Sequence, residues 1–291
     1  MIVLLTGATG FIGRNVLKLL ILQGSIVYAF GRQAPAMGKD SGIKQWIEGD
    51  LESGSGLADI PWSRIDTVIH LAAAGVKAAE RFWPQALAVN VTGTQRLLNV
   101  IDQMGRAPAI FIACTFYEKT IPKNPVLLEN PYIATKAAAS ELARLFAISY
   151  SGSMVFGTFF QVYGPDDNDE NVLSYAATKF RDGHVARFGS GRGLRDWIYI
   201  DDAAYTVVSS ISHAKKGGFD IDIGSGKLIS IREMVEQLYD LYPSAPPPVF
   251  DPSRDQEDTN LAEKARNLLR RGCNLVAPKY GLTQFHKTPS K

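Results

Sequence analysis

Short apolar runs alternate with longer stretches of helical periodicity over residues 1–160. The runs predict strands at residues 2–5, 26–30, 67–70, 109–114 and 154–160, with a weaker strand at 45–48. Between them, apolar positions at helical spacing predict helices at residues 11–23, 88–104 and 132–150. Strands and helices that alternate in this way build a parallel sheet with helices on both faces. The pattern therefore predicts an α/β fold with a doubly wound parallel sheet.

The alternation loosens beyond Pro165. Residues 166–170 read Asp-Asp-Asn-Asp-Glu, which predicts an exposed acidic loop, and a strand at 219–223 precedes a helix at 230–241. Prolines at 243 and 246–248 end any regular element there. No interdomain linker is visible, so we expect a small C-terminal α/β lobe that grows out of the first domain.

A glycine-rich turn joins the first strand to the first helix. It reads Thr6-Gly7-Ala8-Thr9-Gly10-Phe11-Ile12-Gly13, with glycines spaced one residue wider than in the common dinucleotide fingerprint. A helix N-terminus presents free N–H groups and partial positive charge, and absent side chains let an anion approach. An ordinary glycine-rich turn is the alternative. In this context the turn predicts a nicotinamide dinucleotide site formed by Gly7, Thr9, Gly10, Phe11, Ile12 and Gly13.

Composition describes a globular chain. Of its 291 residues, 46% are apolar and 21% are charged, and the net charge is +2. No basic block interleaved with aromatics is present, so nucleic acid is not an expected partner. Cys114 and Cys273 form neither a disulfide framework nor a metal-ligand pattern. No apolar run reaches the ~18 residues of a membrane span. We expect a cytoplasmic protein without a metal or a membrane partner.

Residues after the second and third strands bear on which dinucleotide binds. Arg32 lies two residues past the second strand, where an acidic residue would accept a hydrogen bond from a free 2′-hydroxyl and a cation suits a 2′-phosphate. This favours NADP(H); NAD(H) stays open, because Arg32 can equally be a solvated surface residue. Asp50, followed by Leu51, comes just after the third strand, where a carboxylate can accept a hydrogen bond from the adenine amino group.

The fourth strand ends in His70-Leu71-Ala72-Ala73. The small residues allow the backbone of Leu71, Ala72 and Ala73 to lie close to a cofactor. His70 has no metal partner at usable spacing, so we interpret it as structural. Asn90, inside the next helix, can bridge strands through its side-chain amide, although an ordinary helix asparagine is the alternative.

Tyr132 and Lys136 are four residues apart, on one face of a predicted helix. A nearby ammonium favours the phenolate, which predicts a lowered tyrosine pKa suited to proton transfer. Tyr175 and Lys179 repeat the spacing. Tyr132, however, follows the strand that ends near Thr115, and functional groups in open α/β sheets gather at such strand ends. We therefore interpret Tyr175 as a chance occurrence.

Two more side chains complete the predicted site. Thr115 can offer its hydroxyl to the oxygen that Tyr132 protonates; its neighbours Cys114 and Tyr117 are weaker alternatives. Arg195 follows a glycine-rich turn and can pair with a substrate phosphate through its planar fork. The alternative for Arg195 is an ion pair with Asp201 or Asp202.

Taken together, these motifs resemble the extended short-chain dehydrogenase/reductase family, in its NAD-dependent epimerase/dehydratase branch that modifies nucleotide sugars. The resemblance covers residues 1 to about 230. The matching pieces stand in the family's order: Thr6–Gly13, Gly49-Asp50-Leu51, His70–Ala73, Asn90-Val91-x-Gly93-Thr94, Tyr132-x-x-x-Lys136, Tyr163-Gly164-Pro165, Arg195–Asp202 and Phe219–Gly226.

The resemblance implies an NAD(P)-binding Rossmann domain at residues 1–163, to which 197–225 return, and a mostly substrate-binding lobe at 164–291. It implies that Tyr132 is the general acid/base, that Lys136 also holds the nicotinamide ribose and that Thr115 polarises the sugar C4 oxygen. Gln161 and Arg195 fall where the family contacts the nucleotide diphosphate. A homodimer through the helices at 88–104 and 132–150 is also expected.

Departures from the family bear on the reaction. Dehydratases of the family carry an Asp-Glu pair after the threonine, whereas this chain reads Thr115-Phe116-Tyr117-Glu118, which disfavours dehydration. The local sequence is similar to 4-ketoreductases of the CDP-abequose synthase type. The first hypothesis is therefore NADPH-dependent reduction of a nucleoside-diphosphate 4-keto-6-deoxyhexose. The alternatives are a nucleotide-sugar 4-epimerase with bound NAD and a non-catalytic dinucleotide-sensing regulator on the same fold.

Overall fold

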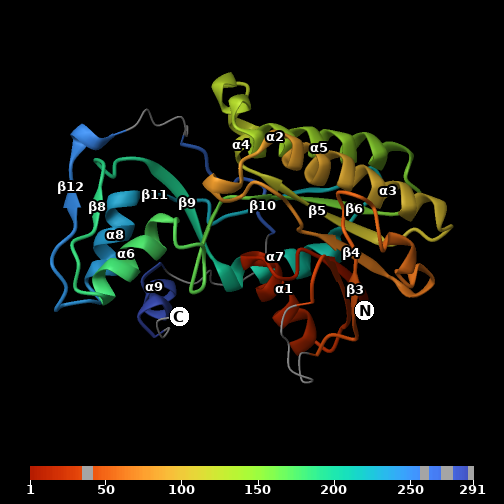
Figure 1. The fold of residues 1–291 in the computed structure, drawn as a ribbon, viewed down its shortest axis with the longest axis horizontal. Coiled ribbons are helices and arrows are strands. Elements are labelled where there is room, and N and C mark those ends of the chain that lie inside the picture. Colours follow the sequence, from red (N-terminus) through yellow and green to blue (C-terminus); the bar gives the residue numbers. More distant parts are fainter. Residues whose placement is uncertain (35–41, 256–261, 270–277, 288–291) are drawn as a thin grey trace.

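A seven-stranded parallel sheet forms the centre of the computed structural model, which describes residues 1–34, 42–255, 262–269 and 278–287 (Figure 1). Its strand order is β10-β6-β5-β4-β1-β2-β3. In that order the strands are Asp220–Ile223, Met154–Phe159, Ala109–Thr115, Thr67–His70, Ile2–Thr6, Ile26–Gly31 and Gln45–Glu48. The predicted α/β fold is confirmed, and each strand predicted for the sheet is present within a residue or two.

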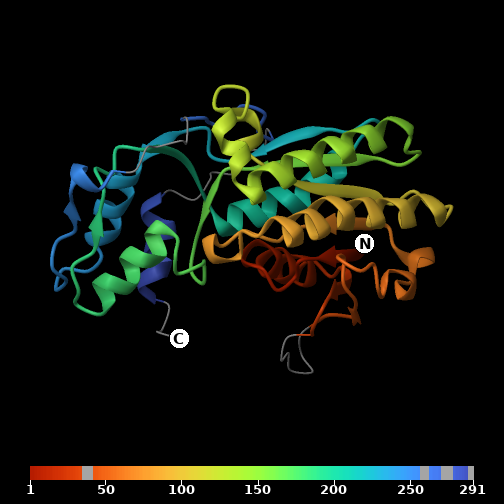
Figure 2. The same cartoon turned by 45° about the horizontal axis from the view of Figure 1, so that its top comes forward.

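Helices cover both faces of the sheet (Figures 1 and 2). On one face lie α1 (Phe11–Leu22) and α7 (Ile200–Ser210); on the other lie α3 (Thr94–Gln103) and α5 (Pro131–Ser149). Strand β1 shows why the strands of this sheet are continuous apolar runs in the sequence. Val3 and Leu5 belong to the core with α1, and Leu4 belongs to the core with α3 and α5. Both faces of a parallel sheet must therefore be apolar.

The helix predicted at 88–104 begins earlier and is not uniform. It consists of α2 (Trp83–Ala86), a π-helical segment η4 (Leu87–Gly93) and α3. A π-helical turn inserts an extra residue and rotates the side chains that follow, and such turns are frequent at functional sites. The irregular segment contains Asn90.

A smaller lobe lies beside the carboxyl edge of the sheet (Figure 1). It contains the sheet β11-β9-β7, formed by Leu228–Ser230, Leu194–Tyr199 and Gln161–Tyr163, and the pair β12-β8, formed by Val249–Phe250 and Arg187–Phe188. Its helices are α6 (Val172–Arg181), α8 (Ile231–Tyr239) and α9 (Pro278–Lys287). Of these elements the sequence predicted only α8.

Short helices complete the described chain. They are α4 (Tyr117–Thr120) and the 3-10 turns η1 (Leu57–Asp59), η2 (Trp62–Arg64), η3 (Ala78–Glu80), η5 (Pro125–Glu129), η6 (Ile211–His213) and η7 (Pro252–Arg254). The loop at 166–170 is exposed as predicted at Asp166, Asp169 and Glu170, whereas Asn168 is half-buried and Asp167 is buried. Its carboxylate accepts from Asn168 N and Asn171 Nδ2, and burial raises the pKa of Asp167 to about 6.

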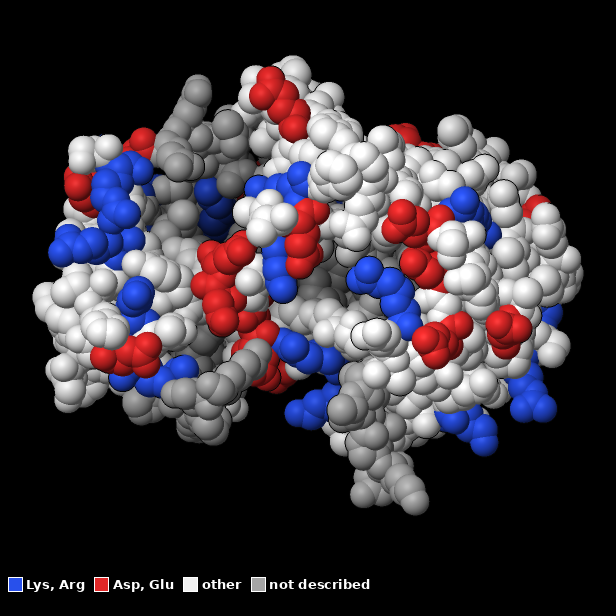
Figure 3. All heavy atoms as spheres, viewed as in Figure 1, with Lys and Arg blue, Asp and Glu red and all other residues white. Residues whose placement is uncertain are grey.

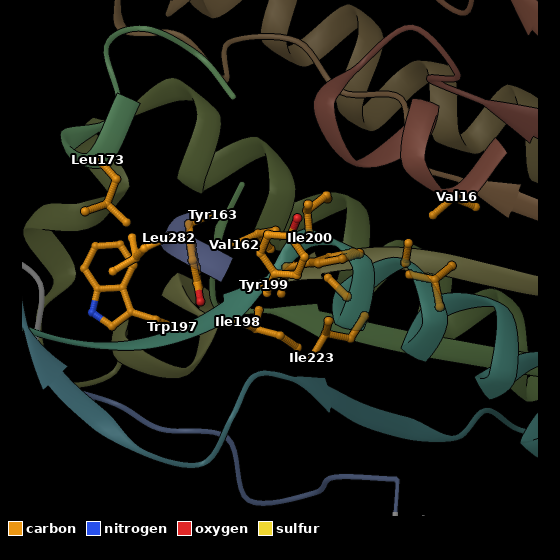
Figure 4. Packing of buried hydrophobic residues seen from close by; sticks show 14 of the residues in the cluster. Val16, Val162, Tyr163, Leu173, Trp197, Ile198, Tyr199, Ile200, Ile223 and Leu282 are labelled. Carbon is orange, nitrogen blue, oxygen red and sulfur yellow. The ribbon is translucent and has the colours of Figure 1, made fainter. Parts of the chain in front are cut away.

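Aromatic side chains fill the junction between the sheet and the smaller lobe (Figure 4). The ring of Tyr163 meets Trp197 and Tyr199 edge-on, with centroids 6.2 and 5.7 Å apart. Helix α9 fits against them through Gly281, where a Cβ atom would lie 2.6 Å from Tyr163 Oη, and through the fully buried Leu282. The junction is therefore close-packed hydrophobic core.

A buried carboxylate joins the chain returning after residue 261 to the rest of the smaller lobe. Asp196 Oδ1 accepts from Ser225 N at 2.6 Å and from Ser225 Oγ at 2.8 Å. Its Oδ2 accepts from Gly226 N at 2.9 Å and from Ala265 N at 2.8 Å. One carboxylate thereby satisfies four donors, which is the condition for burying a charge. Asp196 therefore holds two loops against strand β9.

Candidate active site

The glycine turn after β1 has the shape of an anion cradle. Gly7 has a φ of +74°, and a Cβ on it would lie 2.7 Å from Ala72 N. A Cβ on Gly13 would lie 1.9 Å from Gly7 O. Glycine is required at both positions, because β1 approaches β4 closely at one and α1 packs onto the turn at the other. The residues present thus fit a dinucleotide pyrophosphate.

The N-terminus of α1 is open. Its N-cap is Gly10, which offers no capping side chain, and the first turn carries no acidic residue. Thr9 and Gly10 are exposed, while Phe11 and Ile12 are half-buried. The first N–H groups of α1 therefore face a position where an anion can bind. Arg14, one turn on, donates to the Asp166 carbonyl and so ties α1 to the acidic loop.

The two residues predicted to contact the adenosine part of the dinucleotide, Arg32 and Asp50, lie just beyond β2 and β3. Arg32 follows the last residue of β2 and is exposed. Asp50 is half-buried, and its Oδ1 accepts from the N–H of Glu52 at 2.9 Å. Leu51 is buried beneath Gly93, where a Cβ would lie 2.9 Å from Leu51 Cβ. Arg32 is thus open to solvent, as Thr9 and Gly10 of the glycine turn are, whereas Asp50 is partly covered.

His70 lies inside a hydrogen-bonded chain. Its Nδ1 is 2.8 Å from Thr6 Oγ1 and its Nε2 is 3.0 Å from Thr94 Oγ1. The Thr94 hydroxyl donates to Asn90 O at 2.6 Å, so it accepts from Nε2–H, and Thr6 donates to Nδ1. Burial, together with the charge of Lys136, lowers the pKa of His70 from 6.5 to about 3. These contacts are those of a neutral structural histidine.

Asn90 fixes the loop that follows β4. Its Oδ1 accepts from Ala74 N at 2.8 Å, and its Nδ2 donates to Ala74 O at 3.1 Å and to Thr135 Oγ1 at 2.9 Å. Both backbone groups of Ala74 are therefore held by one amide, which the π-helical segment presents. The half-buried residues Leu71, Ala72 and Ala73 precede this anchor, so their backbone is fixed beside the glycine turn.

Helix α5 begins just before the predicted acid/base. The side chain of Asn130 caps it by accepting from Tyr132 N at 3.0 Å, and Pro131 occupies its first position. Lys136, one turn further, is buried and donates from Nζ to Ala113 O at 2.7 Å. Ala113 is two residues before Thr115, the last residue of β5. The structure thus brings Thr115 and the face of α5 that carries Lys136 together.

The predicted lowering of the Tyr132 pKa is wrong for this structure. Burial raises the pKa of Tyr132, and the negative charge of Glu118 and the neighbouring Tyr117 act in the same direction, while Arg81 opposes them. The ammonium of Lys136 is engaged by Ala113 O. The Tyr132 phenol is therefore protonated at neutral pH, and it needs additional positive charge close by to lose its proton.

The two predicted substrate residues lie in the three-stranded sheet. Gln161 begins β7 and pairs with Trp197 of β9. Arg195 lies two residues before Trp197 and donates from Nη1 to Leu194 O at 2.9 Å. Both side chains are half-buried. Sequence reasoning assigned no role to three acidic groups that the structure makes prominent, Glu118, Asp196 and Asp222. Of these, only Asp222 stands between two apolar residues, Ile221 and Ile223, which is a signal of a buried charge.

Other expectations concern metal, membrane and redox chemistry. Among the described residues, no group of three or more His, Cys, Asp and Glu side chains comes together as a metal site. No helix in that part of the chain is long and apolar enough to span a membrane. Cys114 is a free thiol, and burial raises its pKa to about 12, whereas Cys273 lies outside the described residues.

The visible face of the molecule mixes basic and acidic side chains, without a broad patch of one sign (Figure 3).

Comparison with known proteins defines the class. Residues 3–224 match the NAD dependent epimerase/dehydratase family, to which this chain belongs. A UDP-glucuronate 4-epimerase of Thermodesulfobacterium geofontis is 29% identical over 81% of this chain and 79% of that protein. A dTDP-glucose 4,6-dehydratase of Streptomyces griseus is 27% identical over 81% of this chain and 76% of that protein. The chain is an NAD(P)-dependent enzyme that acts on nucleotide sugars.

Solved structures agree with this class. MoeE5 in complex with UDP-glucose and NAD has a TM-score of 0.77 and 27% identity, over 98% of each chain. The UDP-glucuronic acid 4-epimerase of Bacillus cereus has a TM-score of 0.78 over 99% of this chain and 98% of that one, and at 21% identity it supports the fold. Relatives of these kinds favour the epimerase alternative over the 4-ketoreductase that the sequence suggested.

The buried, neutral His70 predicts a specific dependence of stability on pH. An unfolded histidine is protonated below its ordinary pKa of 6.5, whereas folded His70 stays neutral down to about 3. The unfolded state then binds the extra proton, so the free energy of unfolding falls as pH decreases through this window, by up to ~1.4 kcal/mol per pH unit. Urea unfolding of wild type and His70→Gln between these limits should show a shallower slope in the variant. An unchanged slope, compared with His213→Gln as control, would contradict the assignment.

Proposed function

We propose that this protein is a nucleotide-sugar 4-epimerase that keeps its nicotinamide dinucleotide bound through the cycle. The observation that carries the proposal is the junction of β5 and α5, where Lys136 Nζ bonds to Ala113 O at 2.7 Å, two residues from Thr115 and one helical turn from Tyr132. The open glycine turn and the relatives named as 4-epimerases support it.

The chemistry of each side chain follows from its group. Hydride acceptance from sugar C4, and its return to the opposite face, is what the dinucleotide supplies when bound. With the positive charges of Lys136 and of an oxidised nicotinamide close by to favour its phenolate, Tyr132 Oη would take the proton of the C4 hydroxyl during oxidation and give it back during reduction. Thr115 Oγ1 donates a hydrogen bond to the same oxygen, and the ammonium of Lys136 stabilises the phenolate. Because burial raises the pKa of Tyr132, the phenolate is a strong base once it forms.

Dehydration is disfavoured by the residues after Thr115. Glu118 accepts from Thr115 N and Ser140 Oγ, so its carboxylate is engaged inside the protein. The ring of Phe116 stacks on Phe160, with centroids 5.7 Å apart. The stretch Thr115-Phe116-Tyr117-Glu118 thus provides aromatic rings where a dehydratase needs a pair of carboxylic groups.

One observation favours a second candidate, the NADPH-dependent 4-ketoreductase. Beyond β2 the chain presents the cation of Arg32, which suits a 2′-phosphate. All other residues of the site serve both reactions. A non-catalytic regulator is the weakest reading, because such a protein needs neither the Tyr132–Lys136 pair nor Thr115.

The remaining sequence expectations extend the proposal. We propose that residues 1–163 with 197–225 hold the dinucleotide and that the rest of 164–291 mostly holds the sugar nucleotide, with Gln161 and Arg195 at its diphosphate. We also propose a homodimer through the helices that contain Trp83, Leu87, Leu145 and Ile148. These apolar side chains are exposed on the α2–α3 helix and on α5. Exposed apolar side chains on neighbouring helices are typical of an interface.

Removal of the Tyr132 hydroxyl tests the catalytic assignment. Tyr132→Phe should lower kcat by roughly 10²–10⁴-fold, because the proton transfer is lost, and leave dinucleotide binding intact. The assay follows C4 inversion of UDP-glucose and of UDP-glucuronate by NMR. Tyr175→Phe is the matched control, since Tyr175 has the same spacing to a lysine but lies on α6. Near-normal turnover in Tyr132→Phe would overturn the assignment.

Cofactor retention separates the two reactions. The purified protein should carry NAD through gel filtration, and Arg32→Ala should change NADH and NADPH affinity by less than about fivefold, which is the ~1 kcal/mol of an exposed ion pair. Fluorescence titration measures both affinities, with the exposed Arg64→Ala as control. If wild type prefers NADPH by tenfold or more and Arg32→Ala abolishes that preference, the 4-ketoreductase is the better description.

The homodimer predicts a sensitive position on α5. Ile148 is 74% exposed, so a charge there costs the fold little but disrupts an apolar interface. Ile148→Glu should shift the protein from dimer to monomer in light scattering after gel filtration. Leu22→Glu is the control, since Leu22 on α1 is also 74% exposed. An unchanged dimer in Ile148→Glu, or a monomeric wild type, would contradict the proposed interface.

A further inference from the structure

Glu118 connects the two elements that carry the catalytic groups. It lies in the first turn of α4, directly after β5. Its Oε1 accepts from Thr115 N at 2.9 Å and from Ser140 Oγ at 3.0 Å. Thr115 ends β5, and Ser140 belongs to α5. One half-buried carboxylate therefore bridges the strand and the helix of the proposed active site.

The Thr115 N–H group needs such an acceptor. The pairing of β5 with β4 ends at Ile112, which is opposite His70, so Thr115 extends past this neighbour. On the other side, Phe116 N donates to Phe159 O at 3.0 Å and maintains the pairing with β6. Thr115 is buried, and a buried N–H without a partner costs free energy. Glu118 supplies the acceptor that β4 is too short to supply.

Ser140 lies on the face of α5 that matters for catalysis. It is four residues after Lys136 and eight after Tyr132, which places the three side chains along one side of the helix. The bond from Ser140 Oγ to Glu118 thus fixes that side of α5 relative to the end of β5. Hydrogen bonds to an ionised carboxylate are roughly twice as strong as those between neutral groups, so such a bond holds the position of α5 well.

We propose that Glu118 is a positioning residue of this site, which holds the Thr115 hydroxyl in register with Tyr132 and Lys136. The expected effect on catalysis rests on the proposed function. The link from β5 to α5 through the hydrogen bonds of Glu118 does not depend on it. The sequence gives the role no other support, because Glu118 is not part of the motifs that define the family resemblance.

The charge of Glu118 gives this role a signature in the pH profile. The groups around Tyr132 are Tyr117 and Glu118 from α4, Cys114 from β5 and Arg81 beyond η3, with Lys136 on α5 itself. The carboxylate of Glu118 raises the pKa of Tyr132. Burial raises the pKa of Glu118, opposed by its bonds to Thr115 and Ser140 and by Lys136 and Arg144. A neutral residue at 118 should therefore lower the pKa of Tyr132.

Steady-state kinetics of Glu118→Gln and Glu118→Ala, with NAD and the active nucleotide sugar, test the proposal. Glu118→Ala should lower kcat by roughly ten- to a hundredfold, the effect of a displaced catalytic group, with KM much less affected. Glu118→Gln keeps an acceptor oxygen and should restore most of kcat. It should also move the limb of the pH profile that belongs to Tyr132 to lower pH. Glu141→Gln, an exposed change one residue after Ser140, should alter neither.

Backbone amide exchange provides a measurement that does not depend on activity. In the protein without substrate, the Thr115 amide should exchange faster in Glu118→Ala than in wild type, and Glu118→Gln should keep it protected. If the wild-type protein lacks activity on nucleotide sugars but the three proteins differ in Thr115 amide exchange as expected, the proposed function is wrong and the link from β5 to α5 through Glu118 is supported. Wild-type protection of Thr115 in Glu118→Ala, or wild-type kcat in that variant, overturns the positioning role.

Ser140→Ala covers the case in which Glu118→Ala does not fold. It removes the bond from Ser140 Oγ to Glu118, together with the 3.4 Å contact of Ser140 Oγ with Cys114 Sγ, and leaves the bond between Thr115 N and Glu118. The Thr115 amide should remain protected, while kcat should fall by several-fold because α5 is no longer fixed to the end of β5. An unchanged kcat in Ser140→Ala overturns the part of the proposal that concerns α5.

Discussion

The close approach of β1 and β4 at their carboxyl ends is the constraint on which the rest of the structure depends. Thr6 and His70 are paired across these strands, and Gly7 lies against the backbone of Ala72, where no side chain fits. The strand order reverses at this point, so the helices that follow the two strands leave to opposite faces and open a crevice. The neutral His70 completes the contact, since burial of the ring and the nearby charge of Lys136 both disfavour a charged imidazole there.

The regular part of this fold could be predicted from the sequence because the interior strands of the central sheet are buried on both faces, whereas the edge strand β3, exposed at Gln45 and Glu48, left a weaker pattern. Continuous apolar runs such as residues 109–114 are therefore easy to detect. The smaller lobe was largely missed. Strands β7 and β9 are stabilised by aromatic contacts between Tyr163, Trp197 and Tyr199 and by α9, which is distant in sequence. Such partners leave no local periodicity.

In the candidate site, too, features set by the local sequence could be predicted, whereas features set by tertiary contacts could not. The sequence locates the glycine turn, Asn90 and the Tyr132–Lys136 pair, because these follow a local pattern. It does not give the electrostatics. The prediction that Lys136 lowers the pKa of Tyr132 failed because the depth of burial, the acceptor at Ala113 and the charge of Glu118 are properties of the tertiary structure. Glu118 itself follows two aromatic residues and resembles no motif, so only its hydrogen bonds identify it.

Magnitudes distinguish the two reactions better than motifs do. Arg32 is exposed, so its attraction for a 2′-phosphate is screened by solvent and contributes about 0–1 kcal/mol. The pyrophosphate end is formed by fixed backbone instead, because Gly7 lies against Ala72 and Asn90 holds both backbone groups of Ala74. A site whose fixed contacts lie at that end holds the dinucleotide in either phosphorylation state. The proposed epimerase requires the cofactor to stay bound through a full cycle, and fixed contacts at that end serve this requirement.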